Sequence, residues 1–333
     1  MLRKLIASVT LTAAAVTMTV PAQAAYPERN IQGVVPWGAG GATDIVMRSL
    51  TPYVEKELGG KIIINNRTGG TGVIGSNHVL QARPDGYTLL LAAENAQLYP
   101  LLGLAEFDYS AFETINIIGQ NIAVIAAPAD SKFNSMADLL AEAKANPGTL
   151  RMGVTGAGGL PGSVHAMIEA VDDLKVREVT FAGDGPGITA MLGDHIDFMP
   201  LSLIAAREMI TSGKIKGLAV VSTEELPQLP GVEPITKALP KMESFLPWGP
   251  FWGVWVRKDT PEDIKQKLTD AYAKALGNEE FQTFIKGLGA QPLNLSGEKA
   301  KEFLDRWQSV TTWSLYEAGA SKVSPETLNI PKP

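Results

Sequence analysis

Three glycine-rich stretches could bind an anion through the backbone. They are residues 36–44 (PWGAGGATD), 155–159 (TGAGG) and 183–187 (GDGPG), and each follows an expected strand and opens an expected helix. At such places free N–H groups and the positive end of the helix dipole converge, and glycine lets an anion approach closely. A tight strand-to-helix turn without a ligand is the alternative for each. Three together favour binding, and the lack of a basic residue in any of them predicts binding by backbone amides.

A fourth stretch, GTGVIG at residues 70–75, matches the dinucleotide-binding pattern G-x-G-x-x-G. Glu94 lies 24 residues after Gly70, where such a protein would hold a ribose. Residues 67–69, however, separate the motif from its strand, and an exported enzyme would lack a pool of reduced cofactor. A dinucleotide-binding enzyme is therefore the weaker alternative, and we expect no cofactor.

Other chemistry has little support. The three histidines lack metal-ligand spacing and no H-E-x-x-H or G-x-S-x-G motif occurs, so we expect neither a metal site nor catalysis. The charged run 194–197 (DHID) is interpreted as a solvated turn. We expect Asp44 to cap or charge the first helix turn, and the aromatic residues between 248 and 255 to pack in a hinge and core.

Residues 1–24 have the layout of a secretory signal: Arg3 and Lys4, an apolar run from 5 to 20, and Ala22-Gln23-Ala24 before the cleavage point. We expect an exported, periplasmic protein. Without Arg3 and Lys4 it would carry 35 acidic and 27 basic side chains, a net charge of −8. No basic cluster predicts nucleic-acid binding, and no cysteine offers a disulfide.

The elements that position these loops alternate along the chain. We expect strands at 31–35, 61–65 and 87–92, then at 123–127, 150–154, 178–181, 196–199 and 215–221, and a return strand at 252–257. Helices are expected at 43–58, 72–81, 135–144 and 261–276, with a helical region continuing to about 318. The alternation implies an α/β fold with parallel sheets covered by helices. We expect a first lobe at 25–122, a second at 123–247 and a return to the first at 248–333.

The sequence also resembles a known family across essentially its whole mature length. Residues 36–44, NRTGG at 66–70, PDGYTL at 84–89, GDGP at 183–186, LGDHID at 192–197 and LPGV at 229–232 are similar to the Bug family. These are the periplasmic binding subunits of tripartite tricarboxylate transporters. The resemblance implies a two-lobed type II periplasmic-binding fold, each lobe a mainly parallel sheet flanked by helices. It implies a monomer that closes around a small carboxylate and delivers it to a large and a small membrane subunit.

By position, the resemblance places a set of loop residues at the cleft between the lobes. They are Trp37, Gly38, Ala39, Gly40, Gly41, Ala42, Glu94, Asn95, Thr155, Gly156, Ala157, Gly158, Gly183, Asp184, Gly185 and Ser202.

Several positions depart from the family pattern. Glu94-Asn95 stands where a small or hydroxyl residue is common, Asp184 where a small polar one is, and Leu201-Ser202 where Asp-Asn is frequent. Residues 159–162 lengthen one loop. Glu94 and Asp184 either turn outward, with Asp184 capping a helix, or face a ligand that offers hydroxyl or ammonium donors. A binding protein that serves a sensor would have the same sequence features and is the other alternative.

Overall fold

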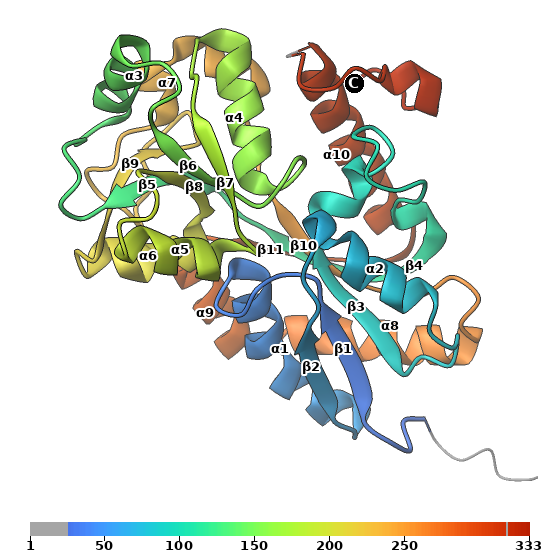
Figure 1. Ribbon diagram of the computed structural model, residues 1–333. Helices are drawn as coiled ribbons and strands as arrows, with labels where there is room; N and C mark the ends of the chain where they lie inside the picture. The colour runs from blue at the N-terminus through green and yellow to red at the C-terminus, as the bar shows by residue number, and fades with distance from the viewer. Residues whose placement is uncertain (1–25, 318) are drawn as a thin grey trace, which may run out of the picture.

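The computed structural model describes residues 26–317 and 319–333 (Figure 1). The expected signal segment, residues 1–24, lies outside the described residues. In the described part the strands form a six-stranded sheet of order β11-β4-β10-β3-β1-β2, a three-stranded sheet β8-β5-β9 and a two-stranded sheet β6-β7. No helix there is long and apolar enough to cross a membrane.

The six-stranded sheet carries the first lobe. Its strands are β1 (Ile31–Val35), β2 (Ile62–Asn66), β3 (Thr88–Ala93), β4 (Phe112–Gln120), β10 (Phe251–Arg257) and β11 (Gln291–Leu295). Its helices are α1 (Ala42–Leu58), η1 (Gly70–Gly72), α2 (Val73–Leu80), η2 (Glu94–Leu98), η3 (Tyr109–Ala111), α8 (Glu262–Leu276), α9 (Glu279–Gly287), α10 (Gly297–Glu317) and η5 (Pro325–Leu328).

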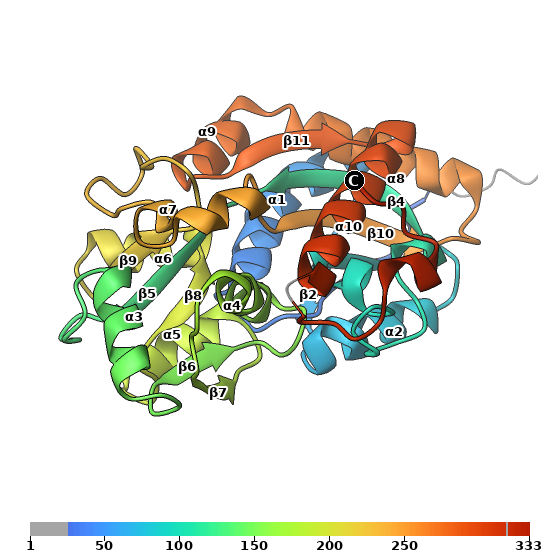
Figure 2. The same cartoon turned by 90° about the horizontal axis from the view of Figure 1, so that it is seen from above.

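The two smaller sheets carry the second lobe. Their strands are β5 (Ala123–Pro128), β6 (Arg151–Val154), β7 (Arg177–Thr180), β8 (Met199–Ser202) and β9 (Ile215–Val220). The helices of this lobe are α3 (Met136–Ala145), α4 (Leu160–Val171), α5 (Asp184–Leu192), α6 (Leu203–Thr211), α7 (Ile235–Ala238) and η4 (Pro240–Phe245). Seen from above, β4 and β10 lie side by side and lead toward this lobe, and α10 lies beside both lobes (Figure 2).

The α/β class with helices on the sheets is as predicted, but the expectation of mainly parallel pairing is wrong. Parallel pairing joins β1 to β2 and β3, and β6 to β7. Antiparallel pairing joins β10 to β3 and β4, β11 to β4, and β5 to β8 and β9. Parallel neighbours need a crossover, usually a helix. β4 and β10, the two strands that lead between the lobes, are instead antiparallel neighbours, and antiparallel neighbours need no such crossover.

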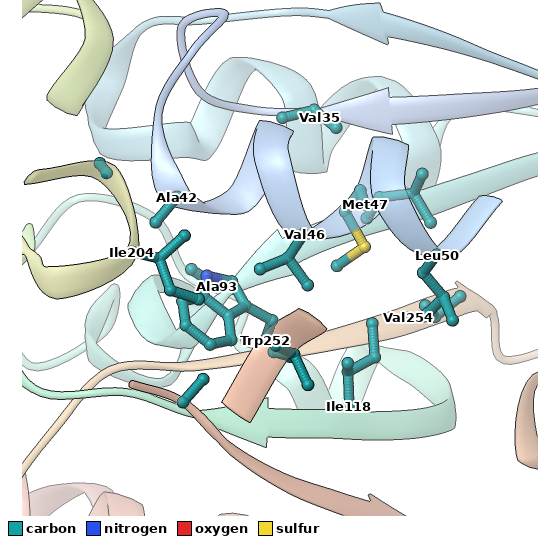
Figure 3. Close-up of a cluster of buried hydrophobic side chains, with 14 of the residues drawn as sticks. Val35, Ala42, Val46, Met47, Leu50, Ala93, Ile118, Ile204, Trp252 and Val254 are labelled. Atoms are coloured by element: carbon teal, nitrogen blue, oxygen red, sulfur yellow. The ribbon is translucent and has the colours of Figure 1, made fainter. Parts of the chain in front are cut away.

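The first lobe's core lies under α1. Val46, Met47 and Leu50 are at most 1 % exposed and belong to the same buried cluster as Ile118 and Val254 of the sheet (Figure 3). The i, i+1, i+4 spacing places the three helix residues on one face. Full burial of each such side chain contributes ~1.5–3 kcal/mol, which holds the N-terminus of α1 firmly above the sheet.

The same apolar cluster continues into the second lobe. Ile204 of α6 lies beside Ala42 and Trp252 (Figure 3), and all three are buried. The two lobes are therefore in contact at the start of α1, the place where the sequence predicts the first anion-binding loop.

Candidate ligand-binding site

A pocket lies between the lobes at the starts of several helices. It has an empty volume of about 420 Å³, its open mouth included. The residues that line it are Trp37, Gly41, Ala42, Thr43, Ala93, Glu94, Asn95, Thr155, Leu160, Pro161, Gly183, Asp184, Ser202, Pro250 and Trp252.

Four α-helices begin at the wall of this pocket. Gly41 is the N-cap of α1, Gly183 that of α5 and Ser202 that of α6, while Leu160 is the first residue of α4. No side chain of these caps bonds back to its own helix. Each N-terminus carries unsatisfied N–H groups and a partial positive charge of about half an electron. These helix starts therefore place partial positive charge at the pocket wall.

The loop that precedes α1 is shaped by buried Asp44. Its Oδ2 accepts a hydrogen bond from the Gly40 N–H at 3.0 Å, and its Oδ1 accepts from Arg48 Nε at 2.8 Å and Asn66 Nδ2 at 2.9 Å. Asn66 Nδ2 also donates to the Trp37 carbonyl at 2.8 Å. Asp44 thus charges the first helix turn, as expected, and in addition fixes the loop above it.

The loops 38–41 and 182–185 pack backbone against backbone across the cleft. The Gly38 N–H donates to the Ala182 carbonyl at 2.7 Å. A Cβ on Gly185 would lie 2.1 Å from the Ala39 oxygen, and one on Gly183 would lie 3.0 Å from the Gly38 nitrogen. Glycine is needed on the second-lobe side because any side chain would hold the lobes apart.

Glu94 faces the pocket from the end of β3. It is 3 % exposed, and its Oε2 has no hydrogen-bond partner. Burial raises the pKa of the Glu94 carboxyl to about 8, and the negative charge of Asp184 adds to the rise. The backbone N–H groups of Glu94 and Phe251 offset part of it. Glu94 is thus mostly protonated at neutral pH.

Asp184 reaches the pocket from the second lobe. Its Oδ2 accepts from the Ser202 N–H at 3.3 Å. Burial raises the pKa of the Asp184 carboxyl to about 6, while N–H groups of Ser202 and Ala42 act in the opposite direction. The expected cap on its own helix is wrong, because α5 begins at Asp184 itself and Gly183 is the N-cap. Asp184 instead takes up N–H groups at the starts of α6 and, across the cleft, α1.

The structure brings many of the predicted site residues together. Those beside the pocket are Trp37, Gly41, Ala42, Glu94, Asn95, Thr155, Gly183, Asp184 and Ser202. Gly38, Ala39, Gly40 and Gly185 lie instead in the packed contact between the two loops. Gly156, Ala157 and Gly158 line a separate hollow between α4 and the first lobe. That a ligand contacts the first group stays a prediction.

Six pocket residues were absent from the predicted set: Thr43, Ala93, Leu160, Pro161, Pro250 and Trp252. Thr43 belongs to the glycine-rich stretch 36–44, and Leu160 and Pro161 belong to the lengthened loop 159–162. These two sequence features could have identified the three residues. Trp252 packs in the core, as expected, and also forms part of the pocket wall. The position of Trp252 at the pocket depends on how strands that are distant in sequence are arranged in space, which the local sequence does not reveal.

The glycines of the G-x-G-x-x-G motif serve packing. A Cβ on Gly72 would lie 2.8 Å from the Tyr99 hydroxyl, and one on Gly75 would lie 2.8 Å from the Arg67 carbonyl oxygen. Thr71 Oγ1 donates to the Thr155 carbonyl at 3.4 Å.

A family model described as "Tripartite tricarboxylate transporter family receptor" matches residues 46–311. The chain belongs to this family. It is 29 % identical over 296 residues to the UPF0065 protein in the tcbD-tcbE intergenic region of Pseudomonas sp. (strain P51), covering 86 % of each chain. It is 26 % identical over 294 residues to protein BugT of Bordetella pertussis, covering 86 % of this chain and 89 % of that one.

Solved structures agree with the fold. The periplasmic binding protein BugD is 28 % identical with a TM-score of 0.82, covering 89 % of this receptor and 99 % of that chain. MatC from Rhodopseudomonas palustris with bound malate is 24 % identical with a TM-score of 0.76, covering 86 % and 100 %. The resemblance to the Bug family and the two-lobed periplasmic-binding fold are therefore confirmed.

Proposed function

We propose that this receptor captures a small organic carboxylate in the pocket between its lobes and delivers it to the membrane subunits of a tripartite tricarboxylate-type transporter. The observation that carries the proposal is the convergence of four helix N-termini on one pocket. Such termini bind carboxylates without a basic side chain. Proteins of similar fold are described with adipate and with malate, and we carry that ligand class over as part of the proposal.

Closure would be a hinge motion about the two strands that lead between the lobes. We place the lobe boundaries near residues 122 and 248, because β4 belongs to the first sheet, β5 to the second, and β10 returns to the first. We also propose export, with cleavage near Ala24, and a monomeric binding protein. Service to a sensor in place of a transporter is the second candidate, and a large and a small membrane subunit that bind the loaded receptor would favour transport.

The test is calorimetry of the mature chain with unbranched carboxylic acids of about two to six carbons. A ligand concentration of 100 times Kd should raise the unfolding free energy by ~2.7 kcal/mol. A thermal-shift screen before calorimetry detects this stabilisation. Leu160→Trp fills the pocket and should abolish binding, whereas Leu192→Trp, at the 52 % exposed end of α5, should not. Failure of every acid, or full affinity in Leu160→Trp, would overturn the proposal.

A further inference from the structure

We propose that the ligand of this receptor carries an ammonium group as well as a carboxylate, and that Glu94 and Asp184 together receive the ammonium group. This inference rests on the proposed function and narrows it from organic acids in general to zwitterions of the amino-acid type. It follows from the two acidic side chains that face one pocket from opposite lobes.

Glu94 supplies the first observation. Its side chain is almost wholly buried, it lines the pocket, and Oε2 lacks any hydrogen-bond partner in the described chain. A buried polar atom without a partner costs roughly 1–3 kcal/mol, and more when it is charged. Because Glu94 lines the pocket, a ligand that donates a hydrogen bond to the ionised carboxylate would supply the partner that Oε2 lacks.

The charges around Glu94 supply the second observation. The titratable groups near it are Asp184 across the pocket and the Tyr99 and Tyr109 hydroxyls, whose pKa values burial and the Glu94 charge both raise. Among the described residues that line the pocket there is no Lys, Arg or His. A plain dicarboxylate would therefore place more negative charge beside two carboxyl groups. A hydroxyl offers one donor and no charge, whereas an ammonium group offers three donors and the missing positive charge.

Asp184 takes up part of the amide lining of the pocket. Its carboxylate already takes the Ser202 N–H, and it draws on the Ala42 N–H at the start of α1. The first turns of α1 beyond Ala42 and of α4 at Leu160 offer further N–H groups that have no partner within their own helix and could bind a ligand carboxylate. A molecule with one negative and one positive end matches a pocket that is lined by helix N-termini and by two carboxyl groups.

Matched pairs of ligands test this directly. Calorimetry at about pH 7.5 would compare aspartate with succinate, glutamate with glutarate, alanine with propionate and 4-aminobutyrate with butyrate. In any pair that binds, we expect the amino member to bind roughly ten- to hundredfold more tightly, as charged hydrogen bonds require. Equal or tighter binding of the plain acid would overturn the inference and leave the proposed function standing. Failure of all eight compounds would contradict both.

Substitution and pH give independent readouts. Glu94→Gln should remove the preference for the amino member, while Glu57→Gln, on the exposed far end of α1, should keep it.

Because burial raises the pKa of Glu94 to about 8, an ammonium ligand must displace a proton. Its affinity should then rise roughly tenfold or more between about pH 6.5 and 8.5, and release of the proton should appear as a buffer-dependent heat. An affinity that falls over this range would show a protonated Glu94 donating to an anion, and would sink the inference.

Discussion

Glu94 is a carboxyl group that the fold buries without a counter-charge. Its ordinary pKa is near 4.5, and desolvation raises it to about 8 in the folded chain. Folding therefore favours the protonated form, and stability depends on pH. The stability that the protonated Glu94 carboxyl contributes is fully present below pH 4.5, where Glu94 is protonated in both the folded and the unfolded chain. It is lost progressively as pH rises to 8.

The matching prediction concerns Glu94→Gln, which keeps an oxygen for the Phe251 N–H and cannot ionise. A tenfold change in an acid dissociation constant corresponds to ~1.4 kcal/mol, so at pH 7 the variant should be more stable than the wild type by ~3 kcal/mol. At pH 4 the two should be alike. Urea unfolding of the ligand-free proteins at both pH values measures this, with Glu57→Gln expected to follow the wild type. An equal difference at pH 4 and pH 7 would show that packing and not ionisation is responsible.

At the scale of elements, the start of α1 depends on one side chain. Asp44 connects the loop above the helix, through the Gly40 N–H, to Arg48 on the helix and Asn66 on β2. Because it is buried, its removal leaves three donors without their acceptor. The loop would then lose the conformation in which its N–H groups face the pocket.

Asp44→Ala should lower the unfolding free energy by about 2 kcal/mol and weaken ligand binding at least tenfold, as expected when a buried hydrogen-bond network is broken. Asp138→Ala is the control for affinity. Asp138 likewise accepts an N–H, that of Asn134, at 2.8 Å near the start of α3, but it is exposed and does not line the pocket. This control should leave affinity unchanged. If Asp44→Ala lost stability but kept its affinity, the conformation of the loop before α1 would not be required for ligand binding.

How far the sequence predicts these elements depends on how local their signals are. The strands and helices up to residue 93 were predicted to within one or two residues, because apolar period and glycine caps mark them clearly. Strand β4 was not predicted, since buried Asn116 interrupts its apolar run, and its partner Asn294 is distant in sequence. Strand β11 contains Pro292, which only the edge position makes acceptable, and the sequence alone favoured a helix there.

The candidate site shows the same contrast between features with a local sequence signal and features that depend on distant segments. The glycine-rich starts of α1 and α5 and the acidic residues 94 and 184 were identified from the sequence, because each is a local feature. The orientation of the two carboxyl groups could not be predicted, because it depends on Phe251, Ser202 and Ala42, which lie in other segments. The loop 156–158 lies at the contact between the lobes, where the Gly158 carbonyl accepts from Asn95, but it lines a different hollow from the pocket.

At the scale of the whole molecule, the loops beside the pocket are joined across the lobes by uncharged hydrogen bonds. The Gly38 N–H donates to the Ala182 carbonyl, and Asn95 Nδ2 donates to the Gly158 carbonyl at 2.7 Å. Neither contact involves an ion pair, and each individual bond contributes only about 1 kcal/mol net. Such weak links suit a receptor that must open again, because a ligand can add to them without locking the lobes permanently.

Gly185→Ala tests whether this contact is required for capture. The new methyl would lie 2.1 Å from the Ala39 oxygen with the loops packed as in the structure, and separation of the two loops would relieve this overlap. Gly185 lies in the first turn of α5 and has no positive φ, so alanine suits its backbone. We therefore expect the unfolding free energy to change by less than ~1 kcal/mol, while ligand affinity falls at least roughly tenfold and saturating ligand no longer reduces the radius of gyration in X-ray scattering. Gly287→Ala, at the end of α9 with nothing within 4 Å of the new methyl, should behave like the wild type in every assay. Wild-type affinity in Gly185→Ala would mean that the loops 38–41 and 182–185 separate when the ligand is held.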